Sequence, residues 1–398
     1  MRLHLGLSCI ALAALWAIAT NHGPFSDTSV NDLFVYRNYA IVLQDGQLPY
    51  LDFGFEYPPL AALPIWLGGL RGVDEPTYTT VFYLVMLVCG LVGQQLVARL
   101  AGGGRETIVV AWLMVLTPIL IGASLRTHFD LMPVAIATGA LLAFARDRPW
   151  IGFALLGLGT MTKLFPGLLA VLAFAWLFSR GERRTALIGG AIFAAVVVAI
   201  SLPFLSTGYV DSYRFHLDRP VQIESTAASV LFALGGSDVT GTNLRPDRFK
   251  SNGLDGGHAT AVMRLFTLSL AFVLAGIVAL AARRRDARHF VLCCFAALLA
   301  FVTLGKVFSP QFVIWLAPFA ALAWAWRQWA VAALTTVAIA LTQVEFPSRY
   351  VELVQQQPDV IKLVAVRNVL LIAALVVLVT TLARAPRERA VAVAPSAA

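Results

Sequence analysis

The sequence predicts an all-α polytopic membrane protein with about twelve transmembrane helices. Of its 398 residues, 59% are hydrophobic and 13% are charged, whereas a soluble domain carries roughly 25% charged residues. The mean hydropathy is +0.78. Apolar stretches of roughly 17–25 residues recur along the chain, and a helix of that length crosses about 30 Å of hydrocarbon.

The apolar stretches divide the chain into spans with short connections. The first stretch has no small-residue cleavage site before Asn21, so we expect a retained helix rather than a removed signal peptide. Residues 1–385 then form one transmembrane domain, and residues 386–398 form a disordered cytoplasmic tail. We expect spans near residues 4–20, 79–98, 106–123, 130–145, 150–163, 165–179, 186–205, 260–282, 289–304, 310–325, 329–344 and 363–383.

The distribution of charge predicts the orientation in the membrane. The net charge of +8 fits the positive-inside rule, and nothing in the sequence indicates nucleic acid binding. Short Arg-rich connections such as 180–184 and 283–288 are expected in the cytoplasm, together with both termini. Two long segments, 21–78 and 206–259, carry nearly all the Asp, Glu, His and Tyr able to do chemistry. We therefore expect a multi-pass inner (plasma) membrane protein with an extracytoplasmic site.

Several site types have no signature in the sequence. The four cysteines all fall in apolar stretches and indicate buried hydrophobic positions rather than a disulfide framework. No nucleotide-binding glycine motif occurs, and no Cys or His set has zinc spacing. Neither a metal nor another cofactor is expected. No internal repeat of the transporter kind is evident.

Asp32 begins the first polar segment of interest. It precedes an amphipathic run, 33–43, whose spacing predicts a helix lying in the membrane interface and ending at Gly46. A second short apolar stretch, 60–70, predicts another interfacial helix. Asp32 can be a helix N-cap or a general base at the membrane surface, and its position alone does not decide between these roles.

Charged residues also join the third and fourth spans, in the run Arg126-Thr127-His128-Phe129-Asp130. Ionisable side chains at membrane depth are costly, which makes them candidates for function. The structural alternative is an ion pair between Arg126 and Asp130 that stabilises the start of a helix.

Two lysines lie at the outer ends of spans. Lys163 either extends to the interface or offers a charge to a lipid-linked phosphate, and Lys306 is a second phosphate candidate. Ser309 follows shortly after, where it can cap the next span with Pro310 in its first turn or contact a substrate.

The second long segment concentrates charge between residues 213 and 225. This stretch is either a solvated loop helix with internal salt bridges or a binding element. In the second case His216 and Arg219 are the preferred substrate contacts. Residues 235–257 are rich in Gly, Asn and Asp, and predict a mobile segment.

Five groups of residues, in this order, resemble glycosyltransferase family 87. No one of them is highly specific, and the ordered set carries the resemblance, which covers most of the chain. The groups are Asp32-Leu33-x-Val35-Tyr36 with Pro49-Tyr50-x-Asp52-Phe53 and Phe55-Glu56-Tyr57-Pro58-Pro59, then Phe129-Asp130-Leu131-Met132-Pro133, Lys163-x-x-Pro166, His216-x-x-Arg219-Pro220-x-Gln222-x-Glu224-Ser225 and Ser309-Pro310-Gln311 with Trp315.

This resemblance implies a GT-C-type fold and a polyprenol-phosphate-mannose-dependent α-mannosyltransferase of cell envelope biosynthesis. The donor is a polyprenyl-phosphate-linked sugar, the acceptor a lipid or glycan, and Asp32 the catalytic base. Arg126, Lys163 and Lys306 are candidates for the donor phosphate. The candidate substrate contacts are Tyr36, Glu56, Tyr57, His128, Asp130, His216, Arg219, Gln222, Glu224, Ser309 and Gln311.

Two other classes of protein fit the composition. A flippase or transporter of lipid-linked sugars predicts charges along a central cavity, whereas the span interiors are almost free of charge and Arg367 is the main exception. A non-catalytic assembly partner predicts that Asp32, Lys163 and His216 lie scattered rather than together.

Overall fold

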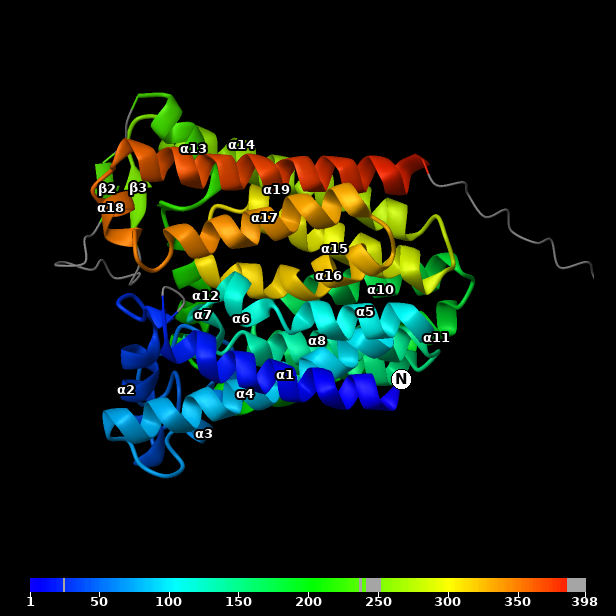
Figure 1. Cartoon of the computed structure of the whole chain (residues 1–398), viewed down its shortest axis with the longest axis horizontal. Helices are drawn as coiled ribbons and strands as arrows, with labels where there is room; N and C mark the ends of the chain where they lie inside the picture. Colours follow the sequence, from blue (N-terminus) through cyan, green and yellow to red (C-terminus); the bar gives the residue numbers. More distant parts are fainter. Residues whose placement is uncertain (24–25, 236–237, 241–251, 385–398) are drawn as a thin grey trace, which may run out of the picture.

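The computed structural model describes residues 1–23, 26–235, 238–240 and 252–384, and it is a bundle of helices that run side by side (Figure 1). Six helical segments in this part of the chain are long and apolar enough to cross a membrane. They are formed by α1 (Arg2–Asn21), α4 (Glu75–Leu100), α11 (Arg183–Ser201), α14 (Ala259–Ala281), α15 (Ala287–Leu304) and α19 (Pro358–Arg384).

Shorter apolar helices complete the bundle. They are α3 (Ala62–Gly68) with the 3₁₀ turn η2 (Pro59–Ala61), α8 (Leu131–Ala145), α9 (Pro149–Thr162), α10 (Phe165–Ser179), α16 (Val313–Ala325) after η4 (Pro310–Phe312), and α17 (Trp329–Glu345). The predicted helical, polytopic membrane architecture is therefore confirmed, apart from a small sheet described below, and the number of twelve spans stays a prediction. The expected tail, 386–398, lies outside the described residues.

One expected span is interrupted. In place of a continuous helix over 106–123, the chain forms α5 (Gly104–Met114) and α6 (Thr117–Ile121). Pro118 lies in the first turn of α6 and has no main-chain N–H to donate, so the helical hydrogen bonds cannot continue unbroken through it. The Thr117 hydroxyl donates to the carbonyl of Met114 at 2.8 Å and satisfies one group at the break. Hydropathy does not reveal this interruption, because both pieces are apolar.

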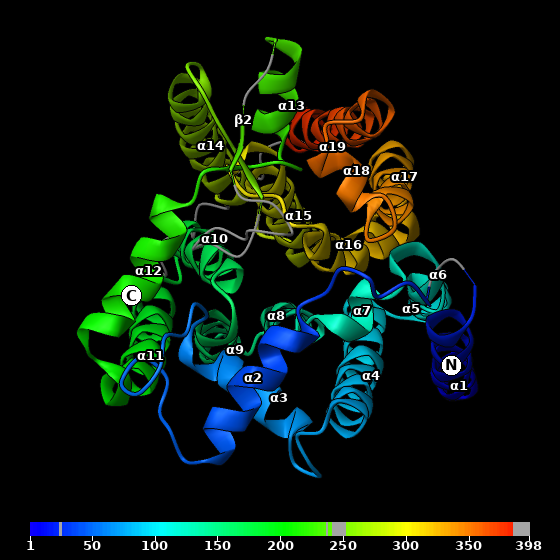
Figure 2. The ribbon, with the colours of Figure 1, turned by 90° about the vertical axis from the view of Figure 1, so that its left-hand side faces the viewer.

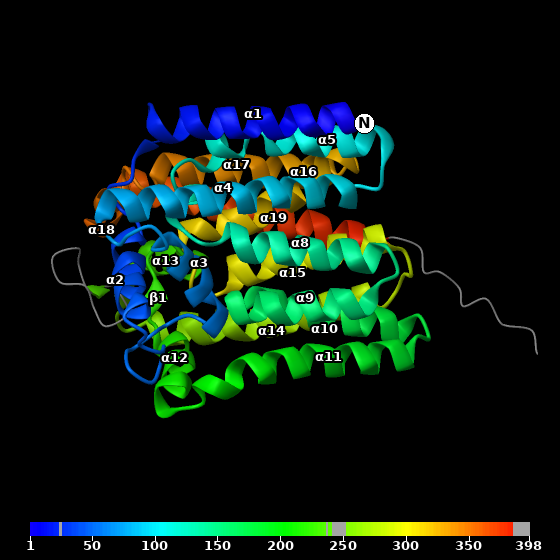
Figure 3. The same ribbon diagram turned by 90° about the horizontal axis from the view of Figure 1, so that it is seen from below.

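The two long polar segments meet at one end of the bundle (Figures 1 and 3). The first contains α2 (Leu33–Gln44) and α3, and the second contains α12 (Thr207–Asp218), after η3 (Leu202–Phe204), and α13 (Thr226–Ala233). Two further short helices, α7 (Ser124–Thr127) and α18 (Tyr350–Val354), lie at the same end, which faces the viewer in Figure 2. We call it the polar end.

A small antiparallel sheet of order β1-β3-β2 also lies at the polar end. Its strands are β1 (Val221–Gln222), β2 (Asp238–Thr240) and β3 (Gly253–Asp255), with Val221 opposite Leu254 and Val239 opposite Leu254. Part of the segment expected to be mobile, 235–257, therefore forms strands. Residues 236–237 and 241–251 of that segment lie outside the described part.

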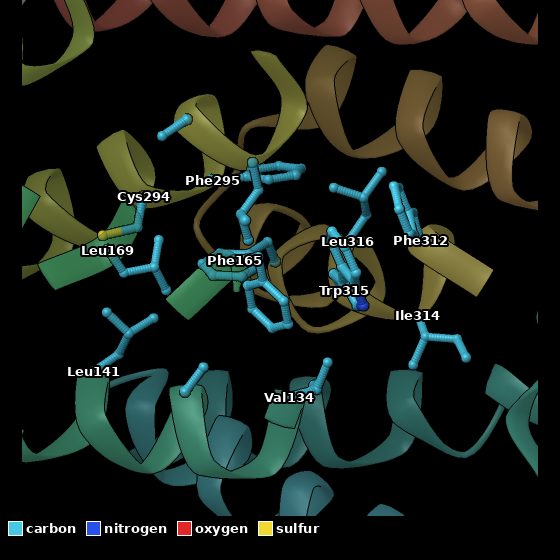
Figure 4. Close-up of a cluster of buried hydrophobic side chains, with 14 of the residues drawn as sticks. Val134, Leu141, Phe165, Leu169, Cys294, Phe295, Phe312, Ile314, Trp315 and Leu316 are labelled. Atoms are coloured by element: carbon cyan, nitrogen blue, oxygen red, sulfur yellow. The ribbon is translucent and has the colours of Figure 1, made fainter. Parts of the chain in front are cut away.

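The core beneath the polar end is dense and aromatic. Figure 4 shows Phe165 of α10 between Trp315 of α16 and the apolar side chains of α8 and α15. The rings of Phe165 and Trp315 stack with centroids 4.4 Å apart, and Phe312 stacks on the other side of Trp315 at 4.0 Å. Cys293 and Cys294 are buried, and all four cysteines are free thiols.

Helices α9 and α11 approach closely because Gly189 has no side chain. A Cβ at position 189 would lie 2.1 Å from Cδ2 of Phe153, which is buried and packs edge-on against Phe144. A Cβ at the neighbouring Gly190 would be 3.5 Å from Phe174, an ordinary contact.

We expect Gly189→Ala to destabilise the bundle by about 1–3 kcal/mol, the usual range for overpacking a core. Gly190→Ala is the matched control, because it makes the same change one residue away without the clash. Thermal unfolding of the two purified variants in detergent measures the difference. Equal unfolding temperatures for the two variants would show that α9 and α11 leave room for a Cβ at position 189.

Candidate active site

Asn31, not Asp32, caps helix α2 with its side chain. The Asn31 Oδ1 accepts the N–H of Leu33 at 2.8 Å, whereas the Asp32 side chain makes no capping hydrogen bond. Of the two roles considered for Asp32, the structure therefore does not support that of a side-chain cap. Its carboxylate is 35% exposed and accepts a hydrogen bond of 3.1 Å from the Tyr36 hydroxyl.

His128, the residue that follows α7, faces the Asp32 carboxylate. Its Nε2 lies 3.5 Å from Asp32 Oδ2, and the imidazole side chain is 2% exposed. On the other side of the ring, Nδ1 is 3.0 Å from the Thr127 hydroxyl and 3.2 Å from the carbonyl of Ser124. Because the Thr127 hydroxyl donates to the carbonyl of Ala123, Nδ1 is surrounded by acceptors and carries the proton. The ring is thus held with Nε2 toward Asp32.

Lys163 forms an ion pair with Asp130. This pair excludes the two structural alternatives considered for these residues, namely an interfacial Lys163 and an ion pair between Arg126 and Asp130. The Lys163 Nζ donates to the two carboxylate oxygens of Asp130 at 2.7 and 2.8 Å, so Lys163 does not extend to the interface. Asp130 is fully buried and also accepts the indole N–H of Trp315 at 2.6 Å. It forms no ion pair with Arg126. A buried carboxylate is stable here because it has a cation and a neutral donor.

Phe129 connects the Asp32 and Asp130 groups. Its ring lies 5.4 Å from the ring of Tyr36 and 5.1 Å from that of Tyr57, and the Lys163 Nζ is 4.8 Å from its centroid. Burial raises the pKa values of Tyr36 and Tyr57, and the Asp32 charge raises both further. The two phenols are therefore neutral donors beside a partly exposed carboxylate. We call Asp32, Tyr36, Tyr57, His128, Phe129, Asp130, Lys163 and Trp315 the Asp32 cluster.

The two long segments are joined at Glu56. Tyr39 donates to its carboxylate, and the His216 Nε2 donates to its main-chain carbonyl at 2.8 Å. Burial lowers the pKa of His216, so the imidazole is neutral near pH 7. Ser206 also donates to the carbonyl of Tyr50 at 3.2 Å. His216 is thus positioned by the first segment, and the salt bridges expected within its own loop are represented by Arg214–Asp211 at 3.3 Å.

The remaining phosphate candidates have different surroundings. Arg126 is 5% exposed, donates to the carbonyl of Ser26 at 3.0 Å and lies over the ring of Tyr83. No carboxylate pairs with it among the described residues. Lys306 instead donates to the main-chain carbonyls of Leu217 and Arg219, and burial lowers its pKa. It thereby holds the end of α12.

Gln222 and Glu224 belong to a separate buried network. The Gln222 amide donates to Glu224 at 2.8 Å, and burial together with the Glu345 charge raises the pKa of Glu224. Arg367 of α19 donates to the Glu224 carbonyl and lies 3.7 Å from the Glu345 carboxylate. The described hydrogen bonds of Gln222 and Glu224 involve neither Asp32 nor Lys163, and the Gln222 main-chain N–H donates to the Lys306 carbonyl at 2.9 Å.

Ser309 does not cap the helix that follows it. It occupies the N-cap position, but its hydroxyl accepts no main-chain N–H at the helix start and instead donates to the Gln311 side chain. The roles of Asn31, Trp315 and Glu345 were not predicted. Trp315 had a sequence signal, since it follows the Ser-Pro-Gln run, whereas Asn31 had only its place before the amphipathic helix.

The described residues contain no group of three His, Cys, Asp or Glu side chains able to hold a metal ion. The Asp32 cluster provides a partly exposed carboxylate, an oriented imidazole and neutral phenols. Arg126, close by in sequence, is a cation with no carboxylate partner among the described residues. Such a set can remove a proton from a hydroxyl and stabilise a departing anion.

Comparison with known proteins gives one match. A model described as glycosyltransferase family 87 matches residues 55–310, which is well over half of the chain. The match includes Glu56, Asp130, Lys163 and His216, and it begins after Asp32. No curated protein and no solved structure matches.

We expect Asp130→Asn and Lys163→Met each to destabilise the protein by about 3–5 kcal/mol, because each leaves one member of a buried pair without its partner. The double variant should lose less than the sum, by about 0.5–3 kcal/mol. Thermal or denaturant unfolding of the four proteins measures this coupling. Strictly additive losses would show that the two side chains do not stabilise each other.

Proposed function

The chain belongs to glycosyltransferase family 87, and from this premise we propose that it transfers a hexose, specifically mannose, from a polyprenyl-phosphate donor to a lipid or glycan acceptor. It is a membrane glycosyltransferase with several apolar helices. The observation that carries the proposed mechanism is the Asp32 carboxylate, which is partly exposed and not engaged in capping its helix.

The proposed reaction is a single displacement. The acceptor hydroxyl oxygen attacks the anomeric carbon, Asp32 takes the hydroxyl proton, and the bond from the anomeric carbon to the phosphate oxygen breaks. Because attack occurs opposite the leaving group, a β-linked donor gives an α-linked product. Tyr36 supports this role by donating its hydroxyl to Asp32 Oδ2, which limits the carboxylate to few orientations. The His128 Nε2 lies 3.5 Å from the same oxygen.

Arg126 is the best-supported ligand for the phosphate among the three cations. The charge of Lys163 is balanced by Asp130, and Lys306 is engaged by two carbonyls. A buried guanidinium without a carboxylate is costly, and a phosphate would supply the missing anion. In this scheme Lys163 and Asp130 position Phe129 and the residues beside it, and Lys306 positions the second segment.

We place the polar end outside the cytoplasm. The Arg-rich connections 180–184 and 283–288 lie at the opposite end of the bundle (Figure 3), where the positive-inside rule puts the cytoplasm. Both termini then face the cytoplasm of a cell whose plasma membrane contains the protein. The donor and acceptor would reach the Asp32 cluster from the outer leaflet, and the prenyl chain would remain among the membrane lipids.

Asp32→Asn should abolish transfer of labelled mannose from polyprenyl-phosphate-mannose to endogenous lipids in membranes, with a loss of at least about 100-fold. Asp52→Asn is the matched control, since Asp52 lies in the same segment and accepts the N–H of Leu48. Both variants should unfold at the wild-type temperature, because Asn31 caps α2. Normal transfer by Asp32→Asn would exclude Asp32 as the base.

Arg126→Gln should raise the KM for the donor by about 10- to 100-fold, which corresponds to a charged hydrogen bond of about 1.5–3 kcal/mol. Arg126→Lys should recover part of this loss. Arg214→Gln removes an exposed arginine at the same end and should leave the KM unchanged. An unaltered donor KM in folded Arg126→Gln would rule out this contact.

A further inference from the structure

A second apolar cluster, apart from the main core, lies at the polar end and joins β1, β3, α13, α14, α18 and α19. Figure 2 shows α19 beside α13, α17 and α18 in this region. Ile223 belongs to the cluster and directly precedes Glu224, and Phe346 belongs to it and directly follows Glu345. Both glutamates are 1% exposed, and nothing in the proposed transfer reaction uses them.

The carboxyl group of Glu224 has no cation of its own. Its Oε2 accepts the Gln222 amide N–H at 2.8 Å, and its Oε1 has no partner within the described part of the chain. Glu224 also forms no ion pair with any described residue. A buried carboxyl group in such surroundings takes up a proton rather than remaining charged. The protonated acid can keep the bond from Gln222, because its carbonyl oxygen still accepts.

The Arg367 guanidinium is directed to other partners. It lies 3.7 Å from the Glu345 carboxylate, and its Nε donates to Asn368 Oδ1 at 3.1 Å. With Glu224 it bonds only to the main-chain carbonyl. Glu345 thus balances the charge of Arg367, and an ionised Glu224 would be a second buried carboxylate without a cation in contact.

The other titratable groups that face Glu224 do not reverse this balance. Tyr350 of α18 is a neutral phenol, because burial raises its pKa and the Glu224 charge raises it further. Arg219, just before β1, and Arg367 favour the ionised form of Glu224. Burial and the Glu345 charge outweigh both cations and raise the pKa of Glu224 well above its ordinary value.

The backbone at Glu224 fastens the second long segment to α19. The Glu224 carbonyl accepts hydrogen bonds from Arg367 and, at 3.2 Å, from the Asn368 amide. The same amide donates to the Ser229 hydroxyl of α13 at 2.9 Å. The start of α13 is therefore held against α19 directly beside the Glu224 carboxyl group.

A short series of bonds leads from this point to the end of α12. The main-chain N–H of Gln222 donates to the Lys306 carbonyl at 2.9 Å. The Lys306 ammonium in turn donates to the carbonyls of Leu217 and Arg219. His216, which bonds to the first long segment, lies in the same last turn of α12. The position of this turn thus depends on how β1 and Glu224 are held.

We propose that Glu224 is a positioning residue that acts as a neutral carboxylic acid, whose proton keeps the second long segment, with His216 and Arg219, in place on the bundle. A proton needs no cavity, so the packed network can bind it. Loss of the proton leaves an unpaired charge beside Glu345 and loosens the segment. The consequence for sugar transfer rests on the proposed function, whereas the protonation and the holding of the segment do not.

Infrared spectroscopy of the full-length protein in neutral detergent tests the protonation. Glu224→Gln is the uncharged isostere, and Asp211→Asn is the control, because Asp211 is an exposed carboxylate of the same segment. At neutral pH the wild-type spectrum should contain a protonated-carboxyl C=O band that Asp211→Asn keeps and Glu224→Gln lacks. Identical bands in wild-type protein and Glu224→Gln would overturn the proposal.

Unfolding temperature as a function of pH is the second measurement. A carboxyl group whose pKa is raised in the folded state makes the protein less stable as pH rises from its unfolded to its folded pKa. Between about pH 5 and about pH 9, wild-type protein and Asp211→Asn should therefore lose more stability than Glu224→Gln. Parallel curves for the three proteins, or failure of Glu224→Gln to fold near neutral pH, would contradict a neutral Glu224.

Hydrogen exchange measured by mass spectrometry tests the positioning role. At about pH 9, peptides covering residues 207–225 should exchange several-fold faster in wild-type protein than in Glu224→Gln, and at about pH 5 the two proteins should exchange alike. Equal exchange at both pH values would show that the proton does not hold the segment. None of these measurements needs a sugar donor, so they remain decisive if the transfer assay fails.

Discussion

The buried carboxylate of Asp130 is the interaction on which the arrangement of the polar end depends. It binds Lys163, which follows α9, and Trp315 of α16, and thereby joins three parts of the chain that are far apart in sequence. Trp315 is in turn stacked between Phe165 and Phe312. The Asp130 carboxylate orients the Trp315 indole, and the stacked rings of Phe165 and Phe312 keep that indole in place to satisfy the carboxylate.

This anchor determines where the residues just before Asp130 lie. Phe129 packs against Tyr36 and Tyr57, and His128 faces Asp32. Because Asn31 caps α2, the Asp32 carboxylate remains available beside these groups. The same anchor balances the charge of Lys163, whereas no carboxylate pairs with Arg126 among the described residues.

Hydropathy and charge in the sequence were sufficient for the helical membrane architecture, and the motifs identified Asp32, Asp130 and Lys163 individually. The pairing of Lys163 with Asp130 could not be predicted from the sequence, because the lysine lies 33 positions after Asp130. The spacing suggested the nearer Arg126 as the partner. The break before Pro118 was hidden by uniform apolarity. Gln222 and Glu224 resembled binding residues in a polar loop, whereas both are buried, bond to each other, and Arg367 of the distant α19 donates to the Glu224 carbonyl.

The central claim is that the Asp32 cluster is the catalytic centre, and a structure of the inactive Asp32→Asn variant with polyprenyl-phosphate-mannose and an acceptor tests it most directly. The account predicts the mannose anomeric carbon at the Asp32 cluster, the acceptor hydroxyl within roughly 2.6–3.2 Å of residue 32, and the phosphate at Arg126. Donor density bound elsewhere in the bundle, with the Asp32 cluster empty, would contradict it.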